Sequence, residues 1–304
     1  MDPRFFLSVR PLWASLAGLI GLVSSPALEG AETKSVEAVR EALTFHASFD
    51  QGIHAEFSRG DGTLHTCLQP NNQSDATGGL NAEGKTRHLK EGGLAGGALQ
   101  FTARDAKWIF FPGLDNVVFN KENWAGTISV WLRLDPENDL DPGYTDPIQL
   151  TPRKWNDAAF FVDFDKGGDP RDFRLGAFAD LGVWNPENKN VNEIPEDRRP
   201  LAMVSAPPFS RERWTHVLFT WERFNTGQKD GVSKLYLNGR LRGEIKGWEQ
   251  TFSWSEAEEV RLFLGLNYIG LLDELSCFSR ALGANEVKSL YALGGNIAQI
   301  IPER

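Results

Sequence analysis

Residues 261–291 constrain the fold of this chain more than any other segment. They read as a strand, a short turn at Gly270, a second strand with the adjacent acids Asp273 and Glu274, and a short helix. From Ala284 onward the apolar residues change from alternation to helical spacing, and a Gly-Gly pair follows as a stop signal. The segment therefore predicts a sheet whose last strand leads into one C-terminal helix.

Strict alternation in the second of these strands, residues 271–278, predicts which side chains face inward. The inward set is Asp273, Leu275 and Cys277, and the outward set is Leu272, Glu274, Ser276 and Phe278. An inward carboxylate is costly unless it has a partner. Asp273 is therefore expected to accept hydrogen bonds or to bind a cation.

Similar strand patterns recur along the whole chain. Alternating segments at 97–101, 126–134 and 213–222, and predicted hairpins at 158–178 and 234–245, are separated by turns rich in Gly, Pro and Asn. In the last hairpin Asn238-Gly239 is the strongest short turn signal, because both residues tolerate positive φ. Almost no helix is expected before Ala284. This pattern predicts an all-β protein, an antiparallel β-sandwich of the jelly-roll type.

The order of these elements resembles the laminin-G-like domains of the concanavalin A-like lectin/glucanase superfamily. The matching strings are FHASFDQG, GGALQF, TISVWLRL, RWTHVLFTWE, KLYLNGRLRG and GLLDELSCFSRALGANEVKSLY. The resemblance implies one concanavalin A-like jelly roll over residues 42–293, with a polar linker at 28–41 and a tail at 294–304. Residues 53–96 and 135–210 are longer than the plain domain needs, and loops of such length often carry function.

Residues 1–27 have the pattern of an export signal. Arg4 and Arg10 precede the apolar run LWASLAGLIGLVSS, and Ser25 and Ala27 are small residues at the −3 and −1 positions of a cleavage site. The run is too short and too rich in Ser and Gly for a bilayer span, which needs about 20 apolar residues. The chain is therefore expected to be exported, to the periplasm or the extracellular space, with no membrane span.

The charge and the cysteines limit the possible partners and cross-links. The net charge of −9 argues against nucleic acid and anionic lipid, since their phosphates would repel this chain. Two cysteines in an exported chain allow one disulfide, Cys67 to Cys277. The equal alternative is that Cys277 packs as a small apolar residue. Sequence does not fix the oligomeric state.

Catalytic signatures are missing from the sequence. The glucanases of the superfamily carry E-x-D-x-x-E on one strand, and this chain has no such motif. The nearest string, with Glu137, Asp139 and Asp141, lies between prolines and reads as a loop. The five histidines lack zinc-ligand spacing, and His216 reads as a packed or surface strand residue rather than a ligand. The sequence therefore predicts no catalytic residues, although a hydrolase or lyase with unfamiliar residues stays as the third alternative.

A structural calcium ion is one cofactor that the resemblance implies. Concanavalin A-like sandwiches often hold Ca²⁺ between the end of the first strand and the closing strand, which points to Asp50 and Asp273. Two carboxylates under-fill the usual shell of six to eight oxygens, so a hydrogen-bonded structural Asp273 is the alternative. The run from Asp163 to Asp169 imitates part of an EF-hand loop but reads as a plain turn.

The ten tryptophans provide the candidate ligand site. Trp124, Trp131, Trp214 and Trp221 fall at or inside strands and are expected in the core. Trp155 and Trp184 stand in polar surroundings instead, and such aromatic faces beside amides and carboxylates suit sugar hydroxyls. The candidate ligand-binding residues are Trp155, Asn156, Asp157, Trp184, Asn185 and Asn188. The alternative for both tryptophans is that they cap the edge of the sandwich.

These observations predict an exported, non-catalytic recognition module that binds carbohydrate. The main alternative is a structural or protein–protein interaction module of the cell envelope. The fold resemblance alone does not choose between a glycan and a protein ligand.

Overall fold

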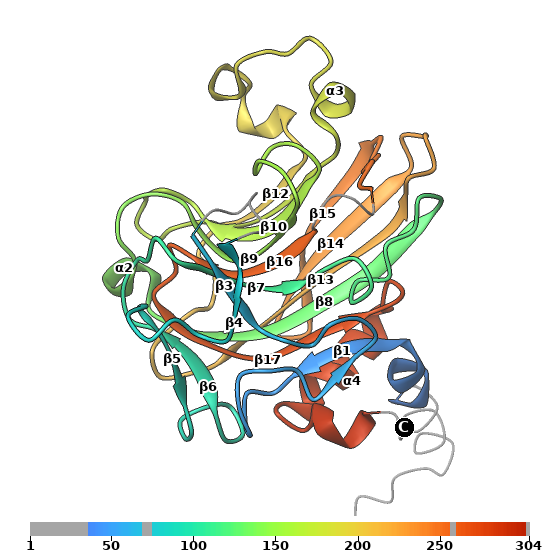
Figure 1. The fold of residues 1–304 in the computed structure, drawn as a ribbon. Helices are drawn as coiled ribbons and strands as arrows, with labels where there is room; N and C mark the ends of the chain where they lie inside the picture. Colours follow the sequence, from blue (N-terminus) through green and yellow to red (C-terminus); the bar gives the residue numbers. More distant parts are fainter. Residues whose placement is uncertain (1–35, 69–74, 256–259, 302–304) are drawn as a thin grey trace, which may run out of the picture.

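Two antiparallel sheets packed face to face form the body of the molecule (Figure 1). The computed structural model describes residues 36–68, 75–255 and 260–301, and the predicted export signal at 1–27 lies outside them. Within these ranges no helix is long and apolar enough to cross a membrane. The antiparallel β-sandwich predicted from the sequence is confirmed.

The first sheet has nine described strands. Its main order is β15 (Arg240–Trp248), β14 (Gly231–Leu237), β13 (Thr215–Phe224), β8 (Trp124–Arg133), β17 (Gly270–Phe278), β1 (Leu43–Ala47) and β2 (Phe57–Ser58), with β6 (Ala98–Phe101) paired to β17 and β5 (Thr86–Leu89) paired to β6. The second sheet has eight: β12 (Leu201–Val204), β11 (Phe173–Phe178), β10 (Ala159–Phe164), β9 (Thr145–Thr151), β16 (Arg261–Leu266), β7 (Trp108–Pro112), β3 (His65–Cys67) and β4 (Thr77–Gly78).

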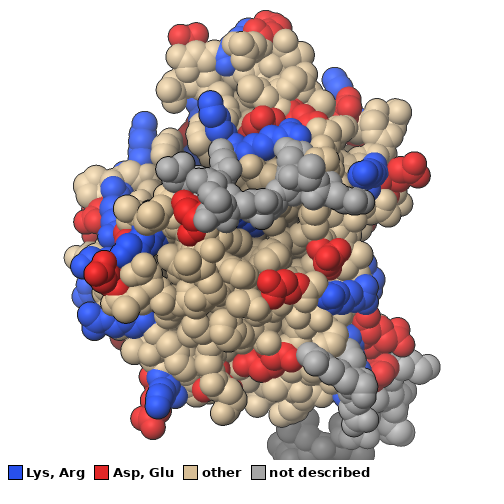
Figure 2. All heavy atoms as spheres, in the orientation of Figure 1, with Lys and Arg blue, Asp and Glu red and all other residues tan. Residues whose placement is uncertain are grey.

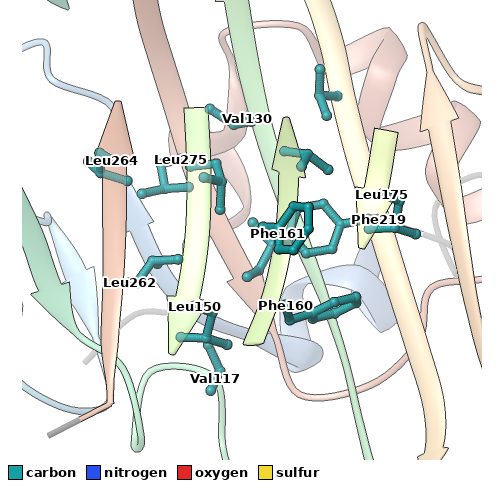
Figure 3. Packing of buried hydrophobic residues seen from close by; sticks show 14 of the residues in the cluster. Val117, Val130, Leu150, Phe160, Phe161, Leu175, Phe219, Leu262, Leu264 and Leu275 are labelled. Atoms are coloured by element: carbon teal, nitrogen blue, oxygen red, sulfur yellow. The ribbon is translucent and has the colours of Figure 1, made fainter. Parts of the chain in front are cut away.

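The core fills the space between the two sheets. Alternate residues of each strand meet there, among them Val130, Leu150, Phe160, Phe219 and Leu275, all completely buried (Figure 3). Each such side chain contributes about 2 kcal/mol by leaving water. Both predicted hairpins are present, and the turn at Asn238 and Gly239 has φ of 50° and 72°. This pair of positive φ values is the reason that Asn-Gly occupies the turn.

Helices cover the outer side of the nine-stranded sheet. The predicted C-terminal helix α4 (Ala284–Leu293) is followed by the short 3-10 helix η4 (Ile297–Ile300), and residues 36–42 are also helical. Residues 36–41 of this helical segment were predicted as part of a polar linker, but Val39 joins Ala42 and Leu290 in a second apolar cluster. The other short helices lie in loops: α2 (Pro136–Asp139), α3 (Leu181–Trp184), η2 (Val191–Glu193) and η3 (Glu196–Arg198).

A β-bulge in β17 changes the predicted alternation. Asp273 pairs with Trp131 and Ser276 with Ser129, so three steps along β17 match two along β8, and Glu274 has φ of 53°. A bulge of this kind shifts the facing of every residue on one side of it. Leu272, predicted to face outward, belongs to the main core, whereas Asp273, predicted to face inward, turns to the loop 91–97.

The cysteines do not form the disulfide that was one of two alternatives. Cys67 lies in β3 of the eight-stranded sheet and packs with Phe110 and Phe263 on its outer side, while Cys277 lies in β17 within the main core. Since the two residues occupy different sheets and different apolar clusters, both are packed as small apolar side chains. Burial raises the pKa of the Cys277 thiol, which disfavours its reactive thiolate.

Candidate functional site

A cavity of about 380 Å³ lies on the outer side of the eight-stranded sheet. Three strands, β9, β10 and β11, form much of its floor, and the loop between β11 and β12 contributes residues to its wall. In Figure 1 this loop, which carries α3, projects beyond the end of the sheet. The lining residues are Trp108, Tyr144, Asp146, Gln149, Arg153, Lys154, Trp155, Phe161, Asp163, Arg174, Phe178, Asn192, Arg199, Leu201, Leu266 and Asn267.

A second bulge, at Pro147, brings Asp146 to this cavity. Thr145 pairs with Phe164 and Ile148 with Val162, so two residues of β9 stand opposite the single residue Asp163 of β10. Proline has no N–H to donate to the neighbouring strand, which is why it occurs at bulges rather than in regular pairing. The extra residue allows Asp146 and Asp163 to line the same cavity, although Ile148 and Val162 point to the core.

Asp163 and Arg174 form a buried ion pair on the cavity floor. Arg174 of β11 donates from Nε to Oδ1 of Asp163 at 2.9 Å, and a second, shorter bond joins Nη2 to Oδ2. Its guanidinium also lies 4.7 Å from the ring centroid of Tyr144 and donates to Glu196 of η3 at 3.1 Å. Burial would lower the pKa of Arg174, but the hydrogen bond and charge of Asp163 outweigh it and raise that pKa. Arg174 is therefore a fixed cation that ties the loop to the sheet.

Asp146 titrates differently from an ordinary aspartate. Burial, and then the negative charge of Asp163, raise the pKa of Asp146 well above its usual value, while Arg174 opposes the rise. The protonated form of Asp146 is thereby favoured, and in that form it can donate a hydrogen bond. In the cavity, Asp146 can therefore donate a hydrogen bond to a ligand, whereas the carboxylate of Asp163 is already bound by Arg174.

Aromatic rings form the other part of the cavity wall. Trp155, in the turn between β9 and β10, is 45% exposed, and its ring meets the edge of Phe178 with centroids 5.6 Å apart. Phe178 stacks on Phe161 at 5.7 Å. Gly176, across the strand pair from Phe161, leaves the space for that ring, since an added Cβ would lie 2.3 Å from it. Trp155 therefore presents an exposed aromatic ring that is supported by the packed rings of Phe178 and Phe161.

The other predicted ligand residues have structural roles. Trp184 is only 6% exposed and donates from Nε1 to the carbonyl of Asn156 at 2.9 Å. Asn185 is buried and bonds twice with the backbone of Lys189, and Asp157 accepts from the backbone of Leu181. Asn188 is exposed in the same loop, with φ of 49°. Of the six predicted residues, Trp155 lines the cavity, whereas Trp184 is packed against Phe178 with ring centroids 4.9 Å apart.

Asp50 and Asp273, the predicted calcium ligands, both bind the loop 91–97. Oδ1 of Asp50 accepts from the backbone N–H of Gly97 at 2.9 Å, and the two oxygens of Asp273 accept from Leu94 and Glu274 at 2.6 and 2.9 Å. Among the residues that the structure describes, no group of three His, Cys, Asp or Glu side chains is arranged to hold a metal ion. As arranged, the pair acts as a hydrogen-bonded support for the loop, and Ca²⁺ binding stays a prediction.

A Ser–His–Glu arrangement beneath the helices is not an active site. Nδ1 of His46 lies 2.9 Å from Oγ of Ser276, and Nε2 lies 3.7 Å from Oε2 of Glu274. All three residues are at most 1% exposed. Burial lowers the pKa of His46 to about 4 and raises that of Glu274 to about 9, so both are neutral near pH 7. Since these side chains are closed off from solvent, a substrate cannot reach them in this structure.

Most residues of the cavity were not predicted from the sequence. Asp163, which was considered only in the incomplete EF-hand string, lies in β10 within the predicted hairpin 158–178. Glu137, Asp139 and Asp141 lie in or next to α2, where Asp139 pairs with Arg211. Of the tryptophans expected in the core, Trp124 and Trp221 are there, Trp131 packs between His216 and Tyr291, and Trp214 is partly exposed beside Arg133. The one usable signal for the cavity was Pro147 inside an apolar strand, which marks a bulge.

Comparison with known proteins supports the fold. A search of curated proteins gave no match. Among solved structures, domain 4 of AbnA, a GH43 extracellular arabinanase from Geobacillus stearothermophilus, in complex with arabinotriose, is 20% identical with a TM-score of 0.43, and the alignment covers 82% of this chain and 98% of that one. The binding domain of Paraclostridial Mosquitocidal Protein 1 is 14% identical with a TM-score of 0.50, covering 83% and 52%. The binding domain of botulinum neurotoxin DC in complex with SialylT is 13% identical with a TM-score of 0.51, covering 84% and 52%.

The TM-scores of 0.50 and 0.51 show that the two toxin binding domains share the fold of this chain, which matches about half of their length. A family model matches more directly, over residues 112–288, which is more than half of the sequence. The matched region runs from the end of β7 into α4 and includes the strands that form the cavity floor. The chain therefore belongs to the concanavalin A-like lectin/glucanases superfamily.

Proposed function

We propose that this chain is an exported, non-catalytic recognition module that binds a carbohydrate in the cavity over β9, β10 and β11. The observation that carries the proposal is the exposed face of Trp155 beside a cavity of about 380 Å³. Small-molecule sites have volumes of roughly 300–1,000 Å³ and combine aromatic walls with a few polar groups. Export follows from the signal pattern of residues 1–27.

The polar groups of the cavity suit sugar hydroxyls. Gln149, Asn192 and Asn267 line it, and each amide offers both a donor and an acceptor. They come from β9, from η2 and from the turn after β16, so three separate segments contribute amides to the cavity. A flat apolar face combined with amides that can donate and accept is the combination that a pyranose ring, with its apolar faces and ring of hydroxyls, requires.

A protein ligand is the second candidate. The binding domain of botulinum neurotoxin DC is also known in complex with rat synaptotagmin II, and that structure is 11% identical with a TM-score of 0.51, covering 84% of this chain and 52% of that one. A chain that contains a sandwich of this fold can therefore have a protein partner. For the present chain this would be a structural or interaction role in the cell envelope.

A glycan array combined with an activity screen on the same polysaccharides tests the proposal. Binding without release of reducing sugar or of unsaturated product supports a non-catalytic module, whereas product release would assign a hydrolase or lyase. Trp155→Ala should weaken binding at least about fivefold, because an aromatic contact contributes about 1 kcal/mol beyond its buried area. Trp214→Ala, which removes a partly exposed tryptophan beside Arg133, is the matched control and should leave binding unchanged. No binding to any glycan would contradict the proposal and favour a protein partner.

A further inference from the structure

The charges around the cavity differ in sign from those of the whole chain. The protein has 41 acidic and 32 basic residues, yet the cavity is lined by four basic residues, Arg153, Lys154, Arg174 and Arg199, and by two acidic residues, Asp146 and Asp163. Near the top of the face shown in Figure 2, below the projecting loop, Lys and Arg side chains lie close to Asp and Glu side chains. A bound molecule therefore meets a local field that the net charge does not describe.

The two acidic residues contribute little negative charge toward a ligand. Asp163 is occupied by two hydrogen bonds from Arg174. Asp146, beside it, is held toward its protonated form by burial and by the charge of Asp163. Neither group therefore presents a free carboxylate to the space above the cavity floor.

Three of the four basic residues are partly neutralised by acids that lie behind the cavity wall. Arg153 pairs with Asp180 at 3.1 Å, Arg174 with Glu196 at 3.1 Å, and Arg199 lies 3.8 Å from Glu196. Asp180 and Glu196 do not line the cavity themselves. The arginines are thus held in fixed positions, and they keep their positive charge at the cavity because a guanidinium stays protonated in proteins.

Lys154 is different from the other three. It lies in the turn between β9 and β10, next to Trp155, and it is exposed. Within residues 36–68, 75–255 and 260–301 its ammonium group forms no ion pair and no hydrogen bond. An exposed cation beside an exposed aromatic ring, at the mouth of a cavity lined by further cations, is suited to an oxyanion carried by a ring-shaped ligand.

We propose that the carbohydrate bound in this cavity is anionic, and that its carboxylate or sulfate group is recognised by Lys154 with the arginines of the cavity wall. This inference rests on the proposed function and specifies its ligand. Neutral hydroxyls would be bound by the amides and by Trp155, while the oxyanion provides the selectivity. A chain with net charge −9 would otherwise repel a polyanion, so the attraction must come from this local group of cations.

Titration of the full-length protein by calorimetry with two pairs of polymers tests the inference. Polygalacturonate is compared with its fully methyl-esterified, neutral form, and dextran sulfate is compared with dextran. The charged member of at least one pair should bind and its neutral counterpart should bind at least tenfold more weakly. Which pair discriminates then identifies carboxylate or sulfate as the preferred group. Binding of the charged polymer should weaken as NaCl is raised, since salt screens exposed charges.

Two lysine variants make the test specific to the cavity. Lys154→Gln should weaken binding of the charged polymer on the order of tenfold, the usual effect of losing one hydrogen bond to a charged group. Lys288→Gln, on α4 at the opposite side of the sandwich, makes the same charge change and should have no effect. Equal binding of charged and neutral polymers, or an unchanged affinity in Lys154→Gln, overturns the anionic ligand while carbohydrate binding stands. If no polymer in either pair binds and the glycan array is also negative, the proposed function itself fails.

Discussion

Breaking the ion pair on the cavity floor should destabilise the whole sandwich. Both partners are almost completely buried, with side-chain exposures of 6% for Arg174 and 3% for Asp163. In Arg174→Met the carboxylate of Asp163 would lose both hydrogen bonds and stay buried without a cation. Removing one partner of such a pair costs about 3–5 kcal/mol, because an uncompensated buried charge remains.

The structure also indicates how that cost can be recovered. When both partners are replaced by apolar residues of similar volume, the buried charge disappears and the net cost approaches zero. Arg174→Met combined with Asp163→Leu should therefore be more stable than Arg174→Met alone, with a coupling energy of about 2 kcal/mol or more. Glu196, which also loses a partner, is 34% exposed and can be hydrated.

Urea unfolding of the wild type, the two single variants and the double variant measures all four free energies. In a domain of this size a loss of about 3 kcal/mol lowers the melting temperature by on the order of 10 °C. A loss below about 1 kcal/mol in Arg174→Met, or a double variant as unstable as the sum of the two single variants, would refute the assignment of a buried, coupled pair.

Three further predictions concern the other end of the molecule and the cysteines. Burial raises the pKa of Asp273 to about 7 and that of Glu274 to about 9, so the folded state retains protons that the unfolded state releases. The contribution of these two groups to stability should fall as the pH rises above about 4, and thermal melts should show that Asp273→Asn loses less stability than the wild type between pH 4 and 7. If Asp50 and Asp273 bind Ca²⁺, EDTA should lower the melting temperature of the wild type but not of Asp273→Ala, and a wild type insensitive to EDTA would exclude the ion. Thiol titration of the denatured, unreduced protein should find two thiols, Cys67 and Cys277, and finding none would show that they are bridged.

Regular strand pairing was the part of the fold that sequence could predict. Val217, Phe219 and Trp221 alternate with His216, Leu218 and Thr220, and β13 places the first set in the main core. Leu218 of the second set joins the cluster under the helices. The Asn238-Gly239 turn was predictable because its positive φ values depend on the local sequence, on those two residues themselves.

The cavity was less predictable because it depends on neighbours across the sheet. Asp146, Asp163 and Arg174 lie on three different strands, and their proximity follows from the order β9-β10-β11 rather than from any local spacing. Trp155 and Trp184 stand in similar polar sequences, yet α3 turns Trp184 onto the ring of Phe178 at 4.9 Å and leaves Trp155 exposed. Local composition cannot distinguish two such residues, since the difference arises from tertiary packing.

Two β-bulges explain why Asp146 and Asp273 do not follow the alternation of inward and outward side chains. The bulge at Pro147 turns Asp146 to the cavity, and the bulge at Glu274 turns Asp273 to the loop 91–97. In a regular strand each of these carboxylates would face the apolar core, where an unpaired charge is costly. One added residue moves the carboxylate to hydrogen-bond donors or to a ligand cavity, while the flanking apolar residues keep their places in the core. At these two register shifts, therefore, the departure from alternation takes an acidic group out of the core and gives it another role.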